Sequence, residues 1–572
     1  MDELKLAESI IKEREIIDAA AGKIPADIVF RNAAFVNVFT QEMETADIAV
    51  KNGIFCGIGS YEGEKEIDAS GKILLPGFVD AHLHLESTLL TPQEFVRAVL
   101  PHGTTTVVAD PHEIANVMGT DGIRYMLQAT EGLPVDVRFM ISSCVPATME
   151  DEAGAHLTWW ETTPFYKNRR VLGLAEMMDY YGVVDGDDDI LRKIRMAMEN
   201  GRNVDGHAPG LTGKPLNAYI AAGVSTDHEC YALEEAIEKL RRGMFILIRE
   251  GTAAHNLEAL MPLLKTRYAD RCMFCTDDKH PNDILERGHI DNIIKAAIAE
   301  GARPGVVIKA ASLNPARHYH IAHQGAIAPG YEADIVVIDS FESFHIEQVY
   351  KKGNLVFDGE VASVPEPVIE PTLIARSHDT FHLRTVTADD FRHSGSLPVI
   401  GLVSREIISS NEGMAETIDT DRDILKIAMA ERHKNTGHIG LGFIKGYGLK
   451  FGAVATSIAH DAHNIIVVGT NEEDMAAAVN RVAEIKGGIT VIDKGEVVAE
   501  LPLEIAGLMT EKPIGVVNET LEAAKEAAHR LGVSYDIDPF MTLSFMSLTV
   551  IPTLRITTHG VYDTESQSYL TT

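Results

Sequence analysis

The chain has 572 residues, which is too long for one compact core and predicts several domains. Hydrophobic residues make up 45% and charged residues 24%, the balance of an ordinary globular protein. The formal net charge of −33 argues against nucleic acids and anionic membranes as partners, because both would repel such a surface. Small neutral or cationic substrates remain open.

The five cysteines are too few and too dispersed for a disulfide framework, which predicts a reducing compartment. The N-terminus opens a charged helical segment without an apolar signal core. A run of about 18 apolar residues, the length of a membrane span, does not occur. We therefore expect a cytoplasmic protein with no membrane segment.

Segments of short strands and turns occur both before and after the middle part of the chain. Residues 1–72 contain a helix and then short strands at 27–30, 34–38 and 47–53, and residues 323–372 return to the same pattern. We expect these two parts to form one split, small β-sandwich module. A proline-rich connector at 364–371 marks a boundary, and residues 373–572 mix strands and helices, which predicts a separate α+β domain.

Residues 73–322 alternate strands with helices, which predicts parallel βα units and an α/β fold of TIM-type (β/α)8 barrel form. Helices are predicted at 92–100, 234–242, 257–264 and 283–300. The eight expected strands are Ile73–His82, Thr104–Asp110, Val137–Ser142, Val171–Glu176, Asn203–His207, Val224–Asp227, Met244–Arg249 and Cys272–Thr276.

Metal-type side chains recur at the ends of these predicted strands. His82 and His84 are two residues apart, so on a strand they point to one face, and Asp80 lies on the same side to orient them. Barrel chemistry lies at the C-terminal ends of the strands. The further strand ends carry Asp110 and His112, Glu176, His207, His228, Arg249 and Asp277. This set predicts a metal centre.

The segment 76–84, with sequence Pro-Gly-Phe-Val-Asp-Ala-His-Leu-His, resembles the amidohydrolase superfamily of metal-dependent hydrolases, as do His207, His228, Asp277 and the turn at 330–334. Within that superfamily the chain is similar to the adenine deaminases. The narrower resemblance rests on the segments 173–178, 205–210, 225–229, 440–443 and 457–464. It covers nearly the whole chain.

The resemblance implies two divalent metal ions. His82, His84 and Asp277 would hold one, His207 and His228 the other, and Glu176 would lie between them. Many members of the superfamily place a carboxylated lysine on the fourth strand; this chain has Glu176, whose two oxygens can bridge two cations. Nitrogen and oxygen donors without thiolate suit Mn²⁺, Fe²⁺ or Zn²⁺, and the resemblance favours manganese or ferrous iron.

The implied activity is hydrolytic deamination of adenine to hypoxanthine and ammonia. Asp277 would act as general base and then as general acid. Glu86, His112 and Glu229 are candidates for protonating the purine ring, and the sequence does not choose among them. Arg249 is placed for substrate contact or for a structural ion pair. Without a basic phosphate-binding cluster, a free base is favoured over a nucleotide.

Two other functions remain open at this point. A cyclic amidohydrolase acting on a dihydropyrimidine or hydantoin ring would use the same metal site, and a catalytically silent barrel scaffold would be expected to lack ligands. A third signature, that of cytidine-type zinc deaminases, is excluded. Arg271 stands where that signature requires proline, and Cys272 and Cys275 would face opposite sides of a strand.

The turn His460-Asp461-Ala462-His463-Asn464 is either a third metal site or a polar turn. We predict that the C-terminal segment docks on the barrel, in the same subunit or across a homodimer, with this turn facing the strand ends. Such closure would exclude water from the metal centre.

Overall fold

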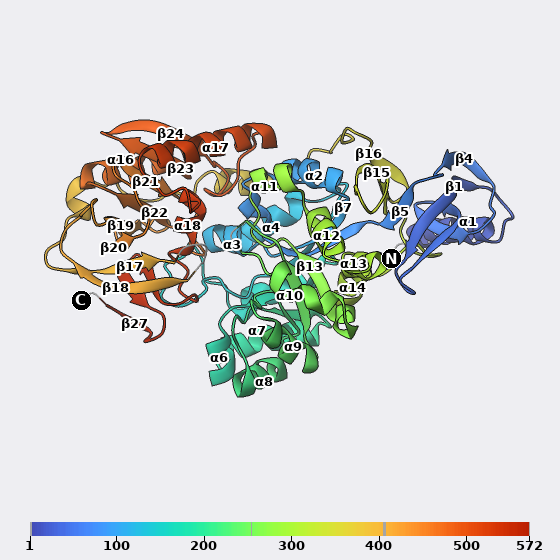
Figure 1. The fold of residues 1–572 in the computed structure, drawn as a ribbon, viewed down its shortest axis with the longest axis horizontal. Helices are drawn as coiled ribbons and strands as arrows, with labels where there is room; N and C mark the ends of the chain where they lie inside the picture. Colours follow the sequence, from blue (N-terminus) through green and yellow to red (C-terminus); the bar gives the residue numbers. More distant parts are fainter. Residues whose placement is uncertain (1–2, 253, 404–407, 571–572) are drawn as a thin grey trace.

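The protein is described by a computed structural model that covers residues 3–252, 254–403 and 408–570. A small N-terminal sheet, a barrel and a C-terminal sheet follow one another along the long axis of the molecule (Figure 1). Within the described ranges, the helices are too short or too polar to cross a membrane.

Eight parallel strands form the barrel, as predicted. β6 to β10 make a five-stranded sheet and β11 to β13 a three-stranded one. The amide of Ser225 donates to the carbonyl of Val204 (2.9 Å), the amide of Asp277 donates to that of His82 (3.0 Å), and these bonds close the ring. The strands are β6 (Phe78–Leu83), β7 (Thr104–Ala109), β8 (Asp136–Ile141), β9 (Val171–Met177), β10 (Asn203–Gly206), β11 (Thr226–Asp227), β12 (Phe245–Arg249) and β13 (Cys272–Cys275).

Helices follow the barrel strands in sequence. The predicted single helix 283–300 is two helices, because Gly288 has a φ of 99° and ends the first one in a conformation that favours glycine. The helices of this region are α2 (Pro92–Val99), α3 (His112–Met118), α4 (Thr120–Ala129), α5 (Trp159–Thr162), α6 (Tyr180–Asp185), α7 (Asp188–Glu199), α8 (Gly213–Ala222), α9 (Leu233–Arg241), α10 (Leu257–Leu264), α11 (Pro281–Arg287), α12 (Ile290–Ala299), α13 (Pro304–Ala310) and α14 (Leu313–His318).

The predicted first barrel strand, Ile73–His82, is also divided in two. β5 (Ile73–Pro76) pairs with strands of the small sheet, and only β6 belongs to the barrel. The chain passes between the sheets at Gly77, where an added Cβ would lie 2.2 Å from Thr105 Oγ1. The apolar run is continuous in sequence, so its hydropathy could not show that its two halves bond to different sheets.

The segments before and after the barrel share one eight-stranded sheet in the order β16-β15-β14-β5-β1-β2-β3, with β4 beside β1. The strands predicted at 27–30 and 34–38 are one strand with a bulge between Phe30 and Ala33. The elements are α1 (Glu3–Ala20), β1 (Ala26–Asn37), β2 (Glu42–Lys51), β3 (Ile54–Ile58), β4 (Gly63–Asp68), β5, β14 (Ile335–Ile338), β15 (Ile346–Lys351) and β16 (Asn354–Phe357).

The C-terminal part contains a second eight-stranded sheet, β18-β17-β20-β19-β22-β21-β23-β24, against which α16 and α17 pack. The elements are α15 (Pro371–Ser377), β17 (Leu397–Leu402), β18 (Ser409–Ala415), β19 (Ile424–Ala430), β20 (Ile439–Lys445), β21 (Ala453–Thr456), β22 (Ile465–Gly469), α16 (Glu472–Glu484), β23 (Gly488–Asp493), β24 (Glu496–Pro502), α17 (Ile514–Arg530), α18 (Pro539–Phe545), β25 (Leu554–Thr557), β26 (Gly560–Asp563) and β27 (Ser568–Tyr569).

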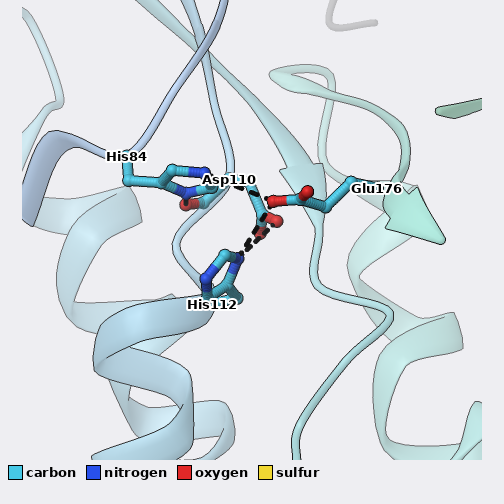
Figure 2. Close-up of side chains that lie close together, drawn as sticks. All are labelled: His84, Asp110, His112 and Glu176. Carbon is cyan, nitrogen blue, oxygen red and sulfur yellow. Dashed lines mark hydrogen bonds and ion pairs between the residues drawn. The ribbon is translucent and has the colours of Figure 1, made fainter. Parts of the chain in front are cut away.

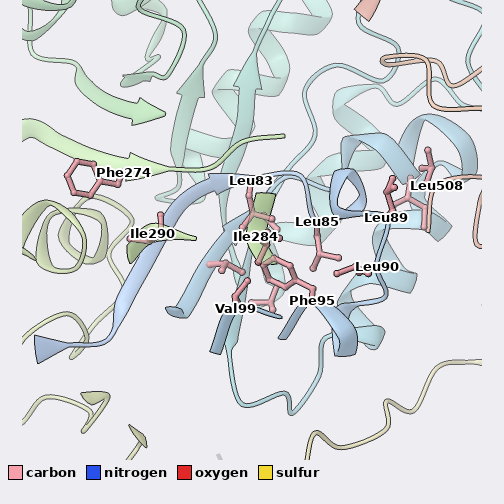
Figure 3. Close-up of a cluster of buried hydrophobic side chains, with 14 of the residues drawn as sticks. Leu83, Leu85, Leu89, Leu90, Phe95, Val99, Phe274, Ile284, Ile290 and Leu508 are labelled. Carbon is pink, nitrogen blue, oxygen red and sulfur yellow. The ribbon is translucent and has the colours of Figure 1, made fainter. Parts of the chain in front are cut away.

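The C-terminal segment packs on the barrel of the same chain, as predicted. Leu508 lies in the same buried cluster as Leu85, Leu89 and Leu90, which follow β6 (Figure 3). The amide of Thr510 donates to the carbonyl of Leu89 (3.0 Å). The apolar core is therefore continuous from the barrel into the C-terminal segment, which fixes the position of that segment above the strand ends.

Candidate metal centre

His82 and His84 lie at the C-terminal end of β6, with ring centroids 4.8 Å apart. Asp80 supports them through the backbone. Its Oδ1 accepts the amide N–H of His82 (3.2 Å) and that of Thr276 (3.2 Å). Asp80 thus fixes the junction of β6 with β13 and acts on His82 through its backbone amide.

Glu176, at the end of β9, lies between two pairs of imidazoles. Its Oε1 is 3.2 Å from Nε2 of His84 and 3.7 Å from Nε2 of His82. Its Oε2 is 2.9 Å from Nδ1 of His207 and 3.3 Å from Nε2 of His228. Each carboxylate oxygen therefore faces a different pair, the arrangement that the sequence resemblance implies for a bridging ligand. Figure 2 shows Glu176 beside His84.

Asp277, which follows β13, completes the set of six donors. Its Oδ1 lies 3.1 Å from Nε2 of His84 and 3.4 Å from Nε2 of His82. Its Oδ2 accepts a hydrogen bond from Arg249, whose guanidinium also donates to Glu229. We call His82, His84, Glu176, His207, His228 and Asp277 the barrel cluster.

The imidazole nitrogens of the barrel cluster fit divalent ions. Nδ1 of His84 lies 3.2 Å from the carbonyl oxygen of Asp110, which can only accept, so Nδ1 carries the proton and Nε2 offers a lone pair to the cluster. Nε2 of His82 is buried without a hydrogen-bond partner among the described residues. An unpaired buried nitrogen beside carboxylates is expected where an ion binds.

The carboxylates of the barrel cluster are in the form that a metal ion requires. Burial opposes their ionisation, but the neighbouring imidazoles of His207, His228 and His84 hold the pKa of Glu176 well below its usual value. For Asp277 burial likewise opposes ionisation, and Arg249 holds the pKa well below its usual value. Deprotonated oxygens are available for a cation at neutral pH.

A buried lysine that the sequence analysis missed positions two of the histidines. Lys239 donates to Asp227 Oδ2 (2.7 Å) and to the carbonyl of Ala208 (2.6 Å), and Asp227 Oδ1 accepts the amide of Ala208 (2.9 Å). Ala208 and Asp227 are the neighbours of His207 and His228 in sequence. Lys239 lies on the buried face of α9. The sequence did contain a sign of this buried ion pair, because Lys239 falls on the apolar face of its helix.

The remaining predicted site residues have different positions. His112 Nδ1 lies 2.9 Å from Asp110 Oδ2 and 3.6 Å from Glu176 Oε1 (Figure 2). Glu229 and Arg249 line the same cavity as the barrel cluster, and Arg249 makes the ion pair that was the alternative to substrate contact. Glu86 accepts the amide of Ile114 (3.2 Å) and is absent from the described lining of the cavity.

The C-terminal segment contributes a wall of this cavity, so its predicted orientation toward the strand ends is confirmed within one subunit. His460, Asp461, Phe545, Leu548 and Ile551 line the cavity together with the residues from the barrel. The sequence analysis did not single out the three apolar residues, because nothing in the pattern of residues 539–551 distinguishes a cavity wall from an ordinary core.

Two histidines of the same turn meet a barrel carboxylate beside this wall. His460 Nδ1 lies 2.8 Å from Glu113 Oε1, and Nε2 of His463 contacts Glu113 Oε2. All three side chains are buried. We call Glu113, His460 and His463 the junction cluster. Glu113 follows His112 directly in sequence and was not predicted as a site residue.

Comparisons with known proteins agree with this architecture. The family model "Amidohydrolase family" matches residues 73–356, and "Adenine deaminase C-terminal domain" matches residues 402–568. Adenine deaminase 2 of Carboxydothermus hydrogenoformans is 44% identical over 97% of this chain and 98% of its own length. Adenine deaminase 1 of Rhizobium meliloti is 45% identical over 96% of this chain and 98% of its own length. The chain belongs to the adenine deaminase family.

Similarity to solved structures is lower. D-hydantoinase (dihydropyrimidinase) from Thermus sp. has a TM-score of 0.47 at 17% identity, covering 59% of this chain and 97% of that chain. The β-aspartyl dipeptidase of Fervidobacterium islandicum has a TM-score of 0.45 at 18% identity, with 59% and 98% covered.

Proposed function

We infer that the chain catalyses the hydrolytic deamination of adenine to hypoxanthine and ammonia. The observation that carries this function is the identity to adenine deaminases over nearly the entire length, which includes both the barrel and the C-terminal segment that line the cavity. All six positions of the barrel cluster hold a metal-binding type of side chain, which argues against a silent scaffold.

We propose that the barrel cluster binds two divalent ions, with His82, His84 and Asp277 on one, His207 and His228 on the other, and Glu176 shared. The donors are nitrogen and oxygen, and the described lining contains no cysteine. This set suits Mn²⁺ or Fe²⁺, and also Zn²⁺. Reconstitution of metal-free protein with each ion, followed by elemental analysis and turnover, tests the proposal; full activity with one ion per subunit would contradict it.

Divalent ions bound here would lower the pKa of water toward about 7 and so supply hydroxide at neutral pH. The residues of the chain do the rest. Asp277 Oδ1 faces the histidines of β6, where it can accept the proton of the attacking water, while Arg249 holds Oδ2 and fixes the carboxylate. Asp277 then transfers the proton to the amine that leaves C6.

The purine ring needs a second proton donor, and we propose His112 or Glu229. Both line the cavity, whereas Glu86 does not belong to its described lining. Burial opposes protonation of His112, but the neighbouring anionic side chains, Asp110 among them, raise its pKa well above the usual value. An imidazolium that faces the cavity can donate a proton at neutral pH. Comparison of the pH–rate profiles of His112→Asn and Glu229→Gln distinguishes the two.

The decisive assay measures ammonia release from adenine against ring opening of dihydrouracil. We expect turnover of adenine alone, since the relatives that match over the full length are named for that reaction. Activity confined to dihydrouracil or a hydantoin would contradict the proposed substrate and support the cyclic amidohydrolase.

We also propose the domain division 1–72 with 323–372, 73–322, and 373–572. The shared sheet of β1–β5 with β14–β16 supports a split first module, and β5 (Ile73–Pro76) extends that sheet four residues past the proposed boundary at residue 72. We also propose that the protein forms a homodimer. Sedimentation of the metal-loaded protein tests the dimer.

A further inference from the structure

The wall that the C-terminal segment gives to the cavity contains three apolar side chains beside His460 and Asp461. The ring of Phe545, from α18, stacks on that of His460 at a centroid distance of 4.8 Å and an interplanar angle of 24°. Leu548 and Ile551 follow in the same wall. Apolar and aromatic surfaces with few polar groups are typical of pockets that enclose a planar heterocycle, and the polar groups determine which one.

One polar group of this wall lacks a partner. Asp461 is 2% exposed, and its Oδ2 has no hydrogen-bond partner among the described residues. Its Oδ1 lies 3.7 Å from His112 Nε2, too far for a hydrogen bond. Buried polar atoms in native proteins are nearly all paired, because an unpaired one loses its hydration without compensation. A donor that the protein does not supply is therefore expected from a ligand.

The other carboxylates that line the cavity have partners. Glu113 contacts His460 and His463, Glu176 contacts the imidazoles of the barrel cluster, Glu229 and Asp277 accept from Arg249, and Asp278 accepts from Ser87. Asp461 is thus the carboxyl of the described lining whose nearest imidazole nitrogens, at 3.7 and 3.9 Å, lie beyond hydrogen-bond distance.

Its distance from the barrel cluster suits a purine. His112 lies between the two, with Nδ1 3.6 Å from Glu176 Oε1 and Nε2 3.7 Å from Asp461 Oδ1. The carboxyl groups of Glu176 and Asp461 are therefore separated by the width of the His112 ring and one contact distance on each side of it. The reacting C6 of adenine must lie at the barrel cluster, and the fused five-membered ring extends away from it. A purine beside His112 would direct the N–H of that ring at Asp461.

We propose that Asp461 accepts the hydrogen bond from the N–H of the five-membered ring, and that the C-terminal segment thereby selects free purine bases against nucleosides. A nucleoside carries its sugar on that nitrogen, so it offers no proton and would place the sugar against a buried wall. The proposal rests on the proposed deamination of adenine. It adds the side chain that distinguishes the free base from the nucleoside.

The test compares kcat/KM for adenine and for 9-methyladenine, in which a methyl group replaces the proton. For the wild type we expect a preference for adenine of about 10³-fold or more, because a site built to bind an N–H discriminates strongly against a substrate that lacks it. In Asp461→Ala, kcat/KM for adenine should fall by about 10- to 100-fold. The value for 9-methyladenine should stay unchanged or rise, so the preference shrinks at least tenfold. Asp461→Asn keeps an oxygen acceptor and should retain more of the preference.

Asp536→Ala, an exposed change in the same part of the chain, is the matched control and should leave the preference unchanged. Metal content, measured for every variant, should equal that of the wild type, which separates substrate recognition from loss of the metal centre. If Asp461→Ala does not fold, Asp461→Ser provides the same comparison, because its hydroxyl is too short to reach the base. A wild-type preference retained in the short variants would overturn the role of Asp461. A wild type that releases no ammonia from adenine would instead overturn the proposed function.

Discussion

His84 of the barrel cluster and His463 of the junction cluster both lie beside a glutamate, but they differ in which imidazole nitrogen carries the proton. In the barrel cluster, His84 donates from Nδ1 to the carbonyl of Asp110, so Nε2 presents a lone pair. In the junction cluster, Nδ1 of His463 accepts the amide N–H of Ala459 (3.3 Å), so Nε2 of a neutral ring carries the proton and donates to Glu113.

This difference decides what each cluster can bind. A metal ion needs the lone pair that His84 offers, whereas the tautomer of His463 supplies a proton to a carboxylate. Burial lowers the pKa of His463 to about 4, which keeps the ring neutral. Of the two readings open for the turn at 460–464, the polar turn is the one that the hydrogen bonds favour, with the turn fastening the C-terminal segment to the barrel. Residue type and proximity alone would assign a third metal site here.

The largest effect is expected for Glu176→Gln in the barrel cluster. A neutral amide bridges two cations poorly and leaves their charge uncompensated, so metal content and kcat/KM should fall together, the latter by about 100-fold or more. Elemental analysis and the adenine assay measure both. Glu258→Gln, an exposed glutamate on α10, is the control. Wild-type turnover in Glu176→Gln would show that Glu176 is not the bridge.

Asp277→Asn tests the proposed role of Asp277 as the general base. The amide cannot accept the proton of the attacking water, so kcat should fall by about 10² to 10⁴. Unlike the glutamate variant, this one keeps the ligands His82, His84 and Glu176, and we expect a smaller loss of bound metal. If kcat stays within tenfold of wild type, another residue is the general base.

A smaller effect is expected for His463→Gln in the junction cluster. Loss of the buried hydrogen bond to Glu113 should lower the free energy of unfolding by about 1–3 kcal/mol, measured by urea titration. Metal content should stay at the wild-type value, because this ring donates a proton. A loss of one metal equivalent would break the comparison and make the junction cluster a metal site.

The smallest effect on stability is expected at a solvent-exposed contact between the C-terminal segment and the barrel. His438 Nδ1 lies 3.0 Å from Glu152 Oε1, and the side chain of His438 is 47% exposed. Exposed ion pairs contribute about 0–1 kcal/mol, so His438→Ala should change the urea midpoint less than His463→Gln does. An equal or larger change would show that burial is not what distinguishes the two contacts.

The sequence by itself determined the barrel and most of its donors. Alternation of strands and helices sets the parallel βα order, and the C-terminal end of each strand is the place where barrel side chains converge, so His82, Glu176 and Asp277 could be expected to meet before any coordinates. The spacing of His82 and His84 needs only the period of a strand. Local rules of this kind suffice because each donor belongs to the same repeated unit.

Only the tertiary structure decided which residues of the C-terminal segment face the barrel cluster and which backbone groups contact its histidines. Asp461 is nearly 400 residues from His82 in sequence, and only packing of the C-terminal segment on the barrel brings its carboxyl into the cavity. Likewise, which nitrogen of His84 or His463 is protonated depends on a backbone group that the fold places beside the ring. No periodicity encodes these contacts, because they join elements that are unrelated by any repeat and their chemistry depends on burial and on the direction of a single hydrogen bond.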